Sequence, residues 1–94
     1  MPDAIGRVAD KFLDELRLMV ADRKIKIVCD DSAKAWLVER GYDVAMGARP
    51  MKRVIAESIK KPLSKMMVLG ELTDGGKITL MVKNNELVLK KTKR

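Results

Sequence analysis

The first long segment of the chain repeats apolar residues with the period of an α-helix. Over residues 4–21, apolar side chains recur at three- and four-residue intervals, which predicts an amphipathic helix with one face against a core. Asp3 is placed to cap its first turn. Leu13 and Leu18 fall outside the predicted stripe and suggest a second contact surface. The stripe consists of Ile5, Val8, Ala9, Phe12, Leu16, Met19 and Val20.

A short strand and a second helix are predicted next. Residues 24–28 alternate lysine with branched apolar side chains, which is the pattern of a half-buried strand. Residues 30–32 (Asp-Asp-Ser) offer capping oxygens to a helix over residues 33–40. Gly41 follows at the position where a left-handed C-terminal cap is expected.

An irregular stretch and an interrupted helix come after Gly41. Residues 42–50 contain Gly47, and a helix is predicted to begin at Pro50 because proline suits the first helical position. Pro62 lacks an N–H group and clashes with the preceding turn, so the sequence predicts a break or kink there. A further helical piece is expected to end at Gly70.

The last part of the chain predicts a β-hairpin. Apolar and polar residues alternate over 77–83 and return over 86–90. Asn84 and Asn85 fit a two-residue turn between the strands, because asparagine tolerates positive φ. A turn at these two residues places charged side chains opposite charged ones and apolar side chains opposite apolar ones. The predicted pairs are Lys83 with Glu86, Val82 with Leu87, and Leu80 with Leu89.

These elements together predict an α+β fold. Three to four helices are expected to pack on a small three-stranded sheet that ends in the hairpin. Whether the strand at residues 24–28 pairs with the hairpin is not decided by the sequence. A length of 94 residues provides one domain, expected over residues 1–90, and residues 91–94 are expected to be a frayed basic tail.

Composition excludes several kinds of chemistry. The chain has no histidine, which removes a Ser-His-Asp triad and any His-ligated metal. Its one cysteine, Cys29, permits no internal disulfide and no Cys cluster, and it fits a small buried apolar residue in a reducing compartment. No apolar run is long enough to span a bilayer, and no secretory signal is visible. A cytoplasmic location is therefore expected, with no membrane partner.

The formal net charge of +7 keeps two other kinds of function open. One is a stand-alone basic module that binds nucleic acid, because neutralised phosphates release counterions. With one Phe, one Trp and one Tyr the chain offers few stacking platforms, so nucleic acid is not the favoured partner. The other is an adaptor that uses some of the seven methionines as an adaptable contact surface.

One local feature suggests an anion site. Arg49 precedes Pro50, where arginine is a poor helix cap because it has no acceptor, and its charge faces the positive end of the helix dipole. Lys52 and Arg53 add cations in the same turn. A phosphate arriving there would meet a guanidinium fork and free N–H groups. In the alternative, Arg49 points to water at a cost of about a few tenths of a kcal/mol.

Five segments carry a family resemblance through their order and spacing: residues 41–43 (Gly-Tyr-Asp), 46–55 (Met-Gly-Ala-Arg-Pro-Met-Lys-Arg-Val-Ile), 59–63 (Ile-Lys-Lys-Pro-Leu), 70–72 (Gly-Glu-Leu) and 75–76 (Gly-Gly). They resemble the C-terminal small subdomain of the second ATPase module of Clp-type AAA+ unfoldases, and most of all the ClpA type. The resemblance extends from about residue 12 to residue 82.

This resemblance implies a lid on a nucleotide site. The lid packs beside the large ATPase subdomain of its own subunit, and Arg49 matches the sensor-2 arginine that reaches the phosphates of ATP. Ala48 is then expected near the base or ribose, and Arg53 is a secondary contact or a solvated residue. Hydrolysis would change the angle between subdomains. The implied partners are the large subdomain, a neighbouring subunit of a hexamer and, through the parent chain, a peptidase such as ClpP.

The sequence departs from a complete ATPase. It contains no Gly-x-x-x-x-Gly-Lys-Ser/Thr loop to hold phosphates, and no apolar strand that ends in paired acids. Asp30 and Asp31 form an adjacent acid pair after the predicted strand, and a helix-cap role is favoured for them over a metal site. The chain is therefore expected to be an excised piece that is not an enzyme alone. ATP would be bound in the parent, with magnesium held by absent sequence, and no cofactor is expected to bind tightly here.

Overall fold

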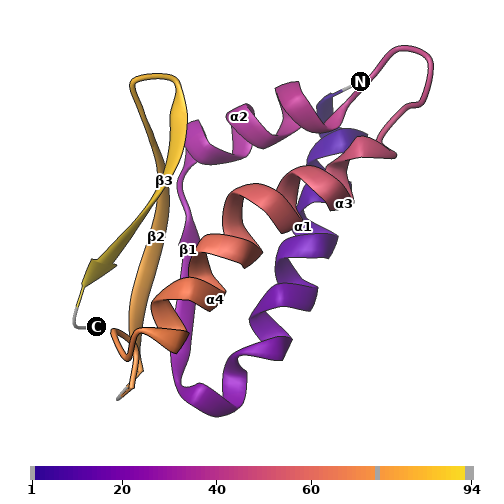
Figure 1. Cartoon of the computed structure of the whole chain (residues 1–94). Coiled ribbons are helices and arrows are strands. Elements are labelled where there is room, and N and C mark those ends of the chain that lie inside the picture. Colours follow the sequence, from indigo (N-terminus) through magenta and orange to yellow (C-terminus); the bar gives the residue numbers. More distant parts are fainter. Residues whose placement is uncertain (1, 74, 93–94) are drawn as a thin grey trace.

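The computed structural model describes residues 2–73 and 75–92, and it has the predicted α+β architecture (Figure 1). The helices gather on one side of a three-stranded sheet, and the sheet ends in the C-terminal hairpin. The elements in chain order are α1 (Pro2–Met19), a 3₁₀ turn (Ala21–Arg23), β1 (Ile25–Cys29), α2 (Asp31–Gly41), α3 (Pro50–Ile55), a π-helical turn (Ala56–Lys60), α4 (Lys61–Val68), β2 (Gly76–Lys83) and β3 (Glu86–Thr92).

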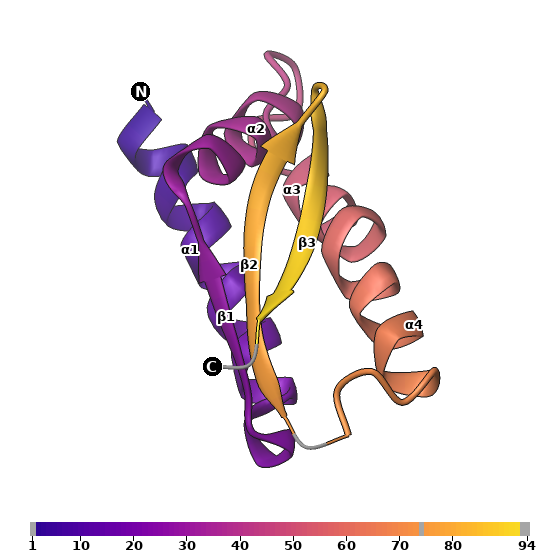
Figure 2. The ribbon, with the colours of Figure 1, turned by 90° about the vertical axis from the view of Figure 1, so that its left-hand side faces the viewer.

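The sheet has the order β1-β2-β3, so β2 is the central strand. β1 runs parallel to β2, and β3 runs antiparallel to β2. The parallel pair is possible because the whole helical segment from α2 to α4 lies between its two strands in the sequence. The helices cover one face of the sheet, and Figure 2 shows the other face with no helix in front of it.

The hairpin confirms the prediction in turn and register. Asn84 and Asn85 have φ values of 54° and 65°, which are the left-handed values that a type I′ turn requires. Lys83 is paired with Glu86, and Leu80 with Leu89, as the two-residue turn dictates. The expected tail differs, because Lys91 and Thr92 belong to β3 and pair with Ile78 and Lys77. Lys93 and Arg94 lie outside the described residues.

The buried face of α1 is rotated from the predicted stripe. Leu13 is a core residue with 1% of its surface exposed, whereas Met19 is 57% exposed. Leu18 is 77% exposed and makes no second packing surface within the described chain. The helix packs against both α2 and α3, and this selects the face built from Ala9, Leu13, Leu16 and Val20. The helix begins at Pro2, so Asp3 lies one residue after its start and the side chain of Asp3 falls outside the described residues.

The first turn of α2 confirms the predicted cap. Asp30 Oδ1 accepts hydrogen bonds from the Ala33 N–H at 2.8 Å and from the Ser32 hydroxyl at 2.7 Å. One of the unpaired N–H groups of the helix start is thereby satisfied. These two donors lower the pKa of the Asp30 carboxyl, the Ala33 N–H most strongly.

The other end of α2 corrects the prediction for Gly41. This residue is the last of the helix, and the C-cap is Tyr42 with an extended backbone (φ −119°, ψ 137°), so no left-handed cap is formed. Glycine is needed here for space. A Cβ at position 41 would lie 2.5 Å from Met51 Sδ and 3.1 Å from Met51 Cα, and Met51 is fully buried. The absent side chain lets the start of α3 pack directly on the end of α2.

At Pro62, where a break or kink is predicted, the helical run from Pro50 to Val68 is not broken, but its regular α-helical geometry is interrupted just before the proline. The segment Ala56–Lys60 is a π-helical turn, after which the Lys61 N–H donates to the Ala56 carbonyl five residues back. Pro62 then lies in the first turn of α4, where a missing N–H is tolerated. The wider π-helical turn therefore accommodates the proline without ending the helical run. The described chain then has three long helical segments, which are α1, α2 and the continuous run from α3 to α4.

We expect Gly41→Ala to lower the free energy of unfolding by about 1–3 kcal/mol, because its methyl group would press on the buried Met51. Gly6→Ala is the matched control, since its Cβ would meet the flexible Lys34 side chain, 3.2 Å away at Cε. That variant should be neutral or more stable because alanine favours helix. Urea titrations measure both values, and equal stability of the two variants would refute the packing role of Gly41.

Asp30→Ala should destabilise the chain by about 1 kcal/mol at neutral pH through loss of the α2 cap. Since the folded pKa of Asp30 is lowered, its contribution is present above about pH 4 and disappears as the pH falls through the folded pKa. Asp30→Asn keeps an acceptor that does not titrate, so it should lose less stability than the wild type on acidification. Thermal melts from neutral to acidic pH test this, and an Asp30→Ala variant as stable as wild type at pH 7 would contradict it.

Candidate functional site

The candidate site lies on the segment that joins α2 to α3. Residues 42–49 project from the helical side of the molecule, at the same end of the molecule as the N-terminal end of α1 (Figure 1). Asp43 and Gly47 exchange two backbone hydrogen bonds of 2.8 Å and 2.6 Å, and Gly47 adopts a φ of 66°. Asp43 Oδ1 also accepts from the N–H groups of Ala45 at 2.7 Å and Met46 at 3.1 Å. The projecting loop is thus held in one shape by its own hydrogen bonds.

Arg49 stands at the end of this loop as an exposed residue. Its side chain makes no cap hydrogen bond, and none of the ion pairs within residues 2–73 and 75–92 includes its guanidinium. Ala48, beside it, is half-buried. A solvated guanidinium with all its donors available can bind an anion without first breaking a contact.

The backbone around Arg49 is more helical than the sequence suggests. Arg49 has φ −54° and ψ −39°, and the Met51 N–H already donates to the Ala48 carbonyl at 3.0 Å. Pro50 has no N–H to offer. The first amide groups of this turn are therefore used or absent, which corrects the expectation that free N–H groups share the work. An anion here would be bound chiefly by the side chain of Arg49.

The backbone of Arg49 is held in place by the buried residues that follow it in α3. Met51 is 0% exposed and Ile55 is 5% exposed, so α3 is anchored one residue after Pro50. Met51 fills the space that Gly41 leaves open at the end of α2. The side chain of Arg49 can move, but its backbone is fixed to the rest of the domain.

Arg53 lies on the same side of the helix as Arg49, four residues later. Its Nε is 3.5 Å from Glu57 Oε2, and the two side chains are 83% and 63% exposed. A pair this exposed is worth about 0.3–0.5 kcal/mol, so it holds Arg53 only weakly. The structure therefore leaves Arg53 as a surface residue with its own partner, in contrast to Arg49.

Trp36 serves packing, whereas Tyr42 is exposed. The Trp36 ring lies against the core, and its Nε1–H donates to the Asn85 carbonyl at 2.9 Å. Arg40 stacks over the same ring, with its guanidinium carbon 4.2 Å from the ring centroid. Together they tie the hairpin turn to α2. No sequence pattern indicated this contact, because its partners are far apart in the chain.

The surroundings of Cys29 do not favour a reactive thiolate. The residue is half-buried at the end of β1, and its thiol donates to the Asp30 carbonyl with a sulfur–oxygen distance of 3.7 Å. Burial raises the pKa of the Cys29 thiol, although nearby Arg17 opposes the shift. The protonated thiol is the less reactive form.

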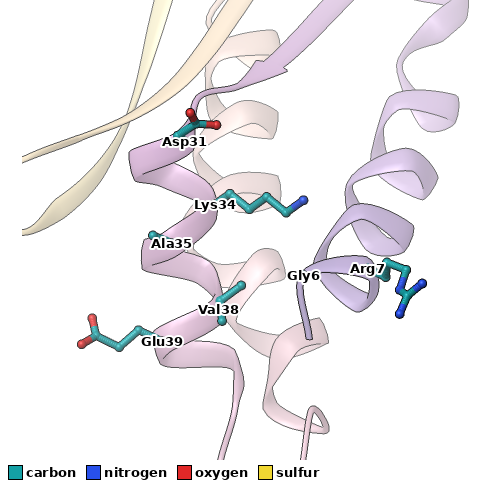
Figure 3. Close-up of a pocket in the computed structure, with 7 residues that line it drawn as sticks. All are labelled: Gly6, Arg7, Asp31, Lys34, Ala35, Val38 and Glu39. Carbon is teal, nitrogen blue, oxygen red and sulfur yellow. The ribbon is translucent and has the colours of Figure 1, made fainter. Parts of the chain in front are cut away.

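A groove with a volume of about 570 Å³ lies between α1 and α2 (Figure 3). Lys34 extends from α2 toward α1, where its Nζ is 2.9 Å from Asp10 Oδ2, and this hydrogen bond raises the pKa of Lys34. The groove wall carries charges of both signs and includes neither Ala48 nor Arg49. Its lining is Gly6, Arg7, Asp31, Lys34, Ala35, Val38 and Glu39.

Within residues 2–73 and 75–92, no group of three acidic or cysteine side chains is arranged to hold a metal ion. Asp30 is occupied as a helix cap, as the sequence analysis favoured. None of the helices in the described part of the chain is long and apolar enough to cross a membrane.

Comparison with known proteins gives consistent matches. A family model described as the C-terminal, D2-small domain of ClpB protein matches residues 1–80. A ClpA homolog protein of Fuscovulum blasticum is 45% identical over 87 residues, which are 93% of this chain and 11% of that protein. The chaperone protein ClpB of Agrobacterium fabrum is 39% identical over 88 residues, or 94% of this chain and 10% of that protein. The chain spans about a tenth of the length of these relatives.

Arg49→Ala should leave the stability of this chain unchanged to within about 0.5 kcal/mol, because the guanidinium makes no contact that holds the fold. Met51→Ala, two residues away, should cost about 2–5 kcal/mol because it empties a fully buried site. Denaturant titrations of the two variants measure the difference. A large loss in Arg49→Ala would mean that the side chain is part of the fold and is not free for a ligand.

Proposed function

Because the chain belongs to the family of C-terminal D2-small domains of ClpB proteins, we propose that it is the lid subdomain of an ATP-dependent protein unfoldase and that Arg49 is its sensor-2 arginine. The observation that carries this proposal is the geometry of Arg49. An exposed guanidinium without an ion pair in the described chain sits at the start of a helix that is anchored by fully buried Met51.

The chemistry of this site fits a triphosphate. The planar fork of Arg49 matches two phosphate oxygens, and its charge does not depend on pH in the physiological range. Ala48 is half-buried and small, so it would leave room for the ribose or base beside the arginine. ATP supplies the bond whose hydrolysis releases energy, and the phosphate loop and magnesium ligands would come from the large ATPase subdomain. This chain alone would then be inactive as an ATPase.

The fold suits a part that transmits motion. Arg49, the end of α2 and the start of α3 are joined by buried packing, so a pull on the guanidinium would act on the domain as a whole. A change in the phosphates would alter this pull and rotate the lid against the large subdomain of its own subunit. In a hexamer, a neighbouring subunit in contact with the lid would be moved as well. A cytoplasmic location and a peptidase such as ClpP belong to the same proposal.

The proposal is tested in the longer ATPase chain that contains this domain. Arg49→Ala should lower ATP turnover by at least about tenfold, because a charged donor aimed at the phosphates is lost. Arg49→Lys keeps the charge without the fork, so its rate should lie between those of Arg49→Ala and the wild type. Steady-state ATP hydrolysis and unfolding of a fluorescent substrate protein are the measurements.

Arg53→Ala is the matched control, because it removes the same side chain from the same helix side one turn later. Its effect on turnover should stay within about twofold, since Arg53 makes only a weak surface pair. Wild-type ATP hydrolysis and unfolding in Arg49→Ala would remove the assignment. An equal loss in Arg53→Ala would show that general surface charge, and not Arg49, is responsible.

A further inference from the structure

The sheet has a face that the helices do not cover, and Figure 2 shows it toward the viewer. Ile27, Ile78 and Leu80 point into the core, so their sequence neighbours point to the opposite side. We call that side the outer face. Its residues are Lys26 and Val28 of β1, Lys77, Thr79, Met81 and Lys83 of β2, and Glu86, Val88, Lys90 and Thr92 of β3.

One half of the outer face gathers positive charge. Lys26 is directly opposite Lys77 across the β1–β2 pair, and Lys90 is opposite Thr79, the next outward residue after Lys77. No carboxylate of residues 2–73 and 75–92 forms an ion pair with any of these three lysines. Like charges that face each other across strands destabilise a sheet. The arrangement therefore works against folding.

The same face shows what a balanced arrangement would be. At the hairpin end, Lys83 is directly opposite Glu86, so opposite charges share a cross-strand position. The excess charge is thus confined to the other end of the sheet, around Lys26, Lys77 and Lys90.

Protection of sheet edges explains only part of this cluster. Lysines on edge strands prevent pairing with other chains, and Lys26 and Lys90 lie on the edge strands β1 and β3. Lys77 lies on the central strand β2, whose two sides are already paired. A central lysine opposite another lysine has no use in edge protection, and it points to an external partner with negative charge.

An apolar row adjoins the basic half. Met81 and Val88 are directly opposite each other, and Val28 lies on the same face of β1. All three are half-buried on a side that has no helix over it. The outer face carries neither arginine nor an aromatic ring. Single-stranded nucleic acid is usually bound on aromatic stacking platforms, which this face lacks, whereas a half-buried apolar row beside the lysines suits a polypeptide.

We propose that the outer face is a binding surface for a polypeptide segment that carries clustered carboxylates next to apolar side chains. The carboxylates meet Lys26, Lys77 and Lys90, and the apolar side chains meet Val28, Met81 and Val88. The partner supplies the negative charge that the face lacks, and it relieves the repulsion between Lys26 and Lys77. This surface is separate from Arg49 and does not depend on nucleotide binding.

The test measures binding of three fluorescein-labelled probes of equal length by anisotropy at physiological ionic strength. The first is a peptide with a run of glutamate followed by a run of valine, the second is polyglutamate, and the third is single-stranded DNA. The mixed peptide should bind most tightly. The combined variant Lys26→Gln, Lys77→Gln and Lys90→Gln should weaken its binding by at least about tenfold.

A charge-matched variant supplies the control. Lys60→Gln, Lys61→Gln and Lys65→Gln remove the same charge from exposed positions on the helical side, and should weaken binding by less than about threefold. Equal weakening by both combined variants would overturn the proposal, because it would mean attraction to net charge alone. Tighter binding of DNA than of the mixed peptide, or no measurable binding of the peptide, would also overturn it.

Lys77→Glu separates binding from folding. It places a carboxylate opposite Lys26, so the melting temperature should be at or above that of the wild type while binding of the mixed peptide is lost. Circular dichroism melts confirm that the variant is folded. Undiminished peptide binding by folded Lys77→Glu would refute the role of the central lysine.

Discussion

The close packing of Met51 against Gly41 is the contact on which the placement of the candidate site depends. Met51 is fully buried at the start of α3, and it occupies the space that a side chain at position 41 would need. This contact brings the end of α2 and the start of α3 together. Residues 42–49 must then leave and re-enter the domain between two fixed points, and Arg49 is held at the second of them. An apolar contact thus positions a charged group that it never touches.

In the described part of the chain, the residues that form the core are different from the residues that carry charge. Its buried residues are apolar, and no buried polar side-chain atom lacks a hydrogen-bond partner. The charged side chains of the described residues therefore lie at or near the surface. Two groups of cations have no ion-pair partner within the described residues: Arg49 at the start of α3, and the three lysines at one end of the outer face. Because the core does not depend on these cations, both surfaces can serve to bind a partner.

Predictions that depend on near neighbours in the chain were confirmed. The Asn84-Asn85 turn, the hairpin register and the Asp30 cap each follow from backbone preferences and hydrogen bonds within a few residues. The helix start at Pro50 follows from the fixed φ of proline. The unusual position of Arg49 before a helix could also be recognised from the sequence, because a poor helix cap is identified from the neighbouring residues alone.

Features that depend on contacts between residues far apart in the chain were not predicted correctly from the sequence. The buried side of α1 was misplaced, because α2 and α3 choose it together and their positions follow from the tertiary fold. Gly41 was recognised as a special position, but for backbone geometry and not for the room that Met51 requires. A break or kink was predicted at Pro62, and the structure places the irregularity in the π-helical turn before it, so that the helical run continues.

The sequence by itself determined the local elements, the kind of fold and a surface arginine in an unusual position. It did so because helix caps, tight turns and alternating strands are decided over short distances, where the residue order is the whole cause. Only the tertiary structure decided that β1 joins the hairpin through the central strand β2. That pairing places Lys26 opposite Lys77, although fifty residues separate them in the chain. Long-range contacts of this kind arise from packing the helices onto one side of the sheet, and no local pattern specifies them.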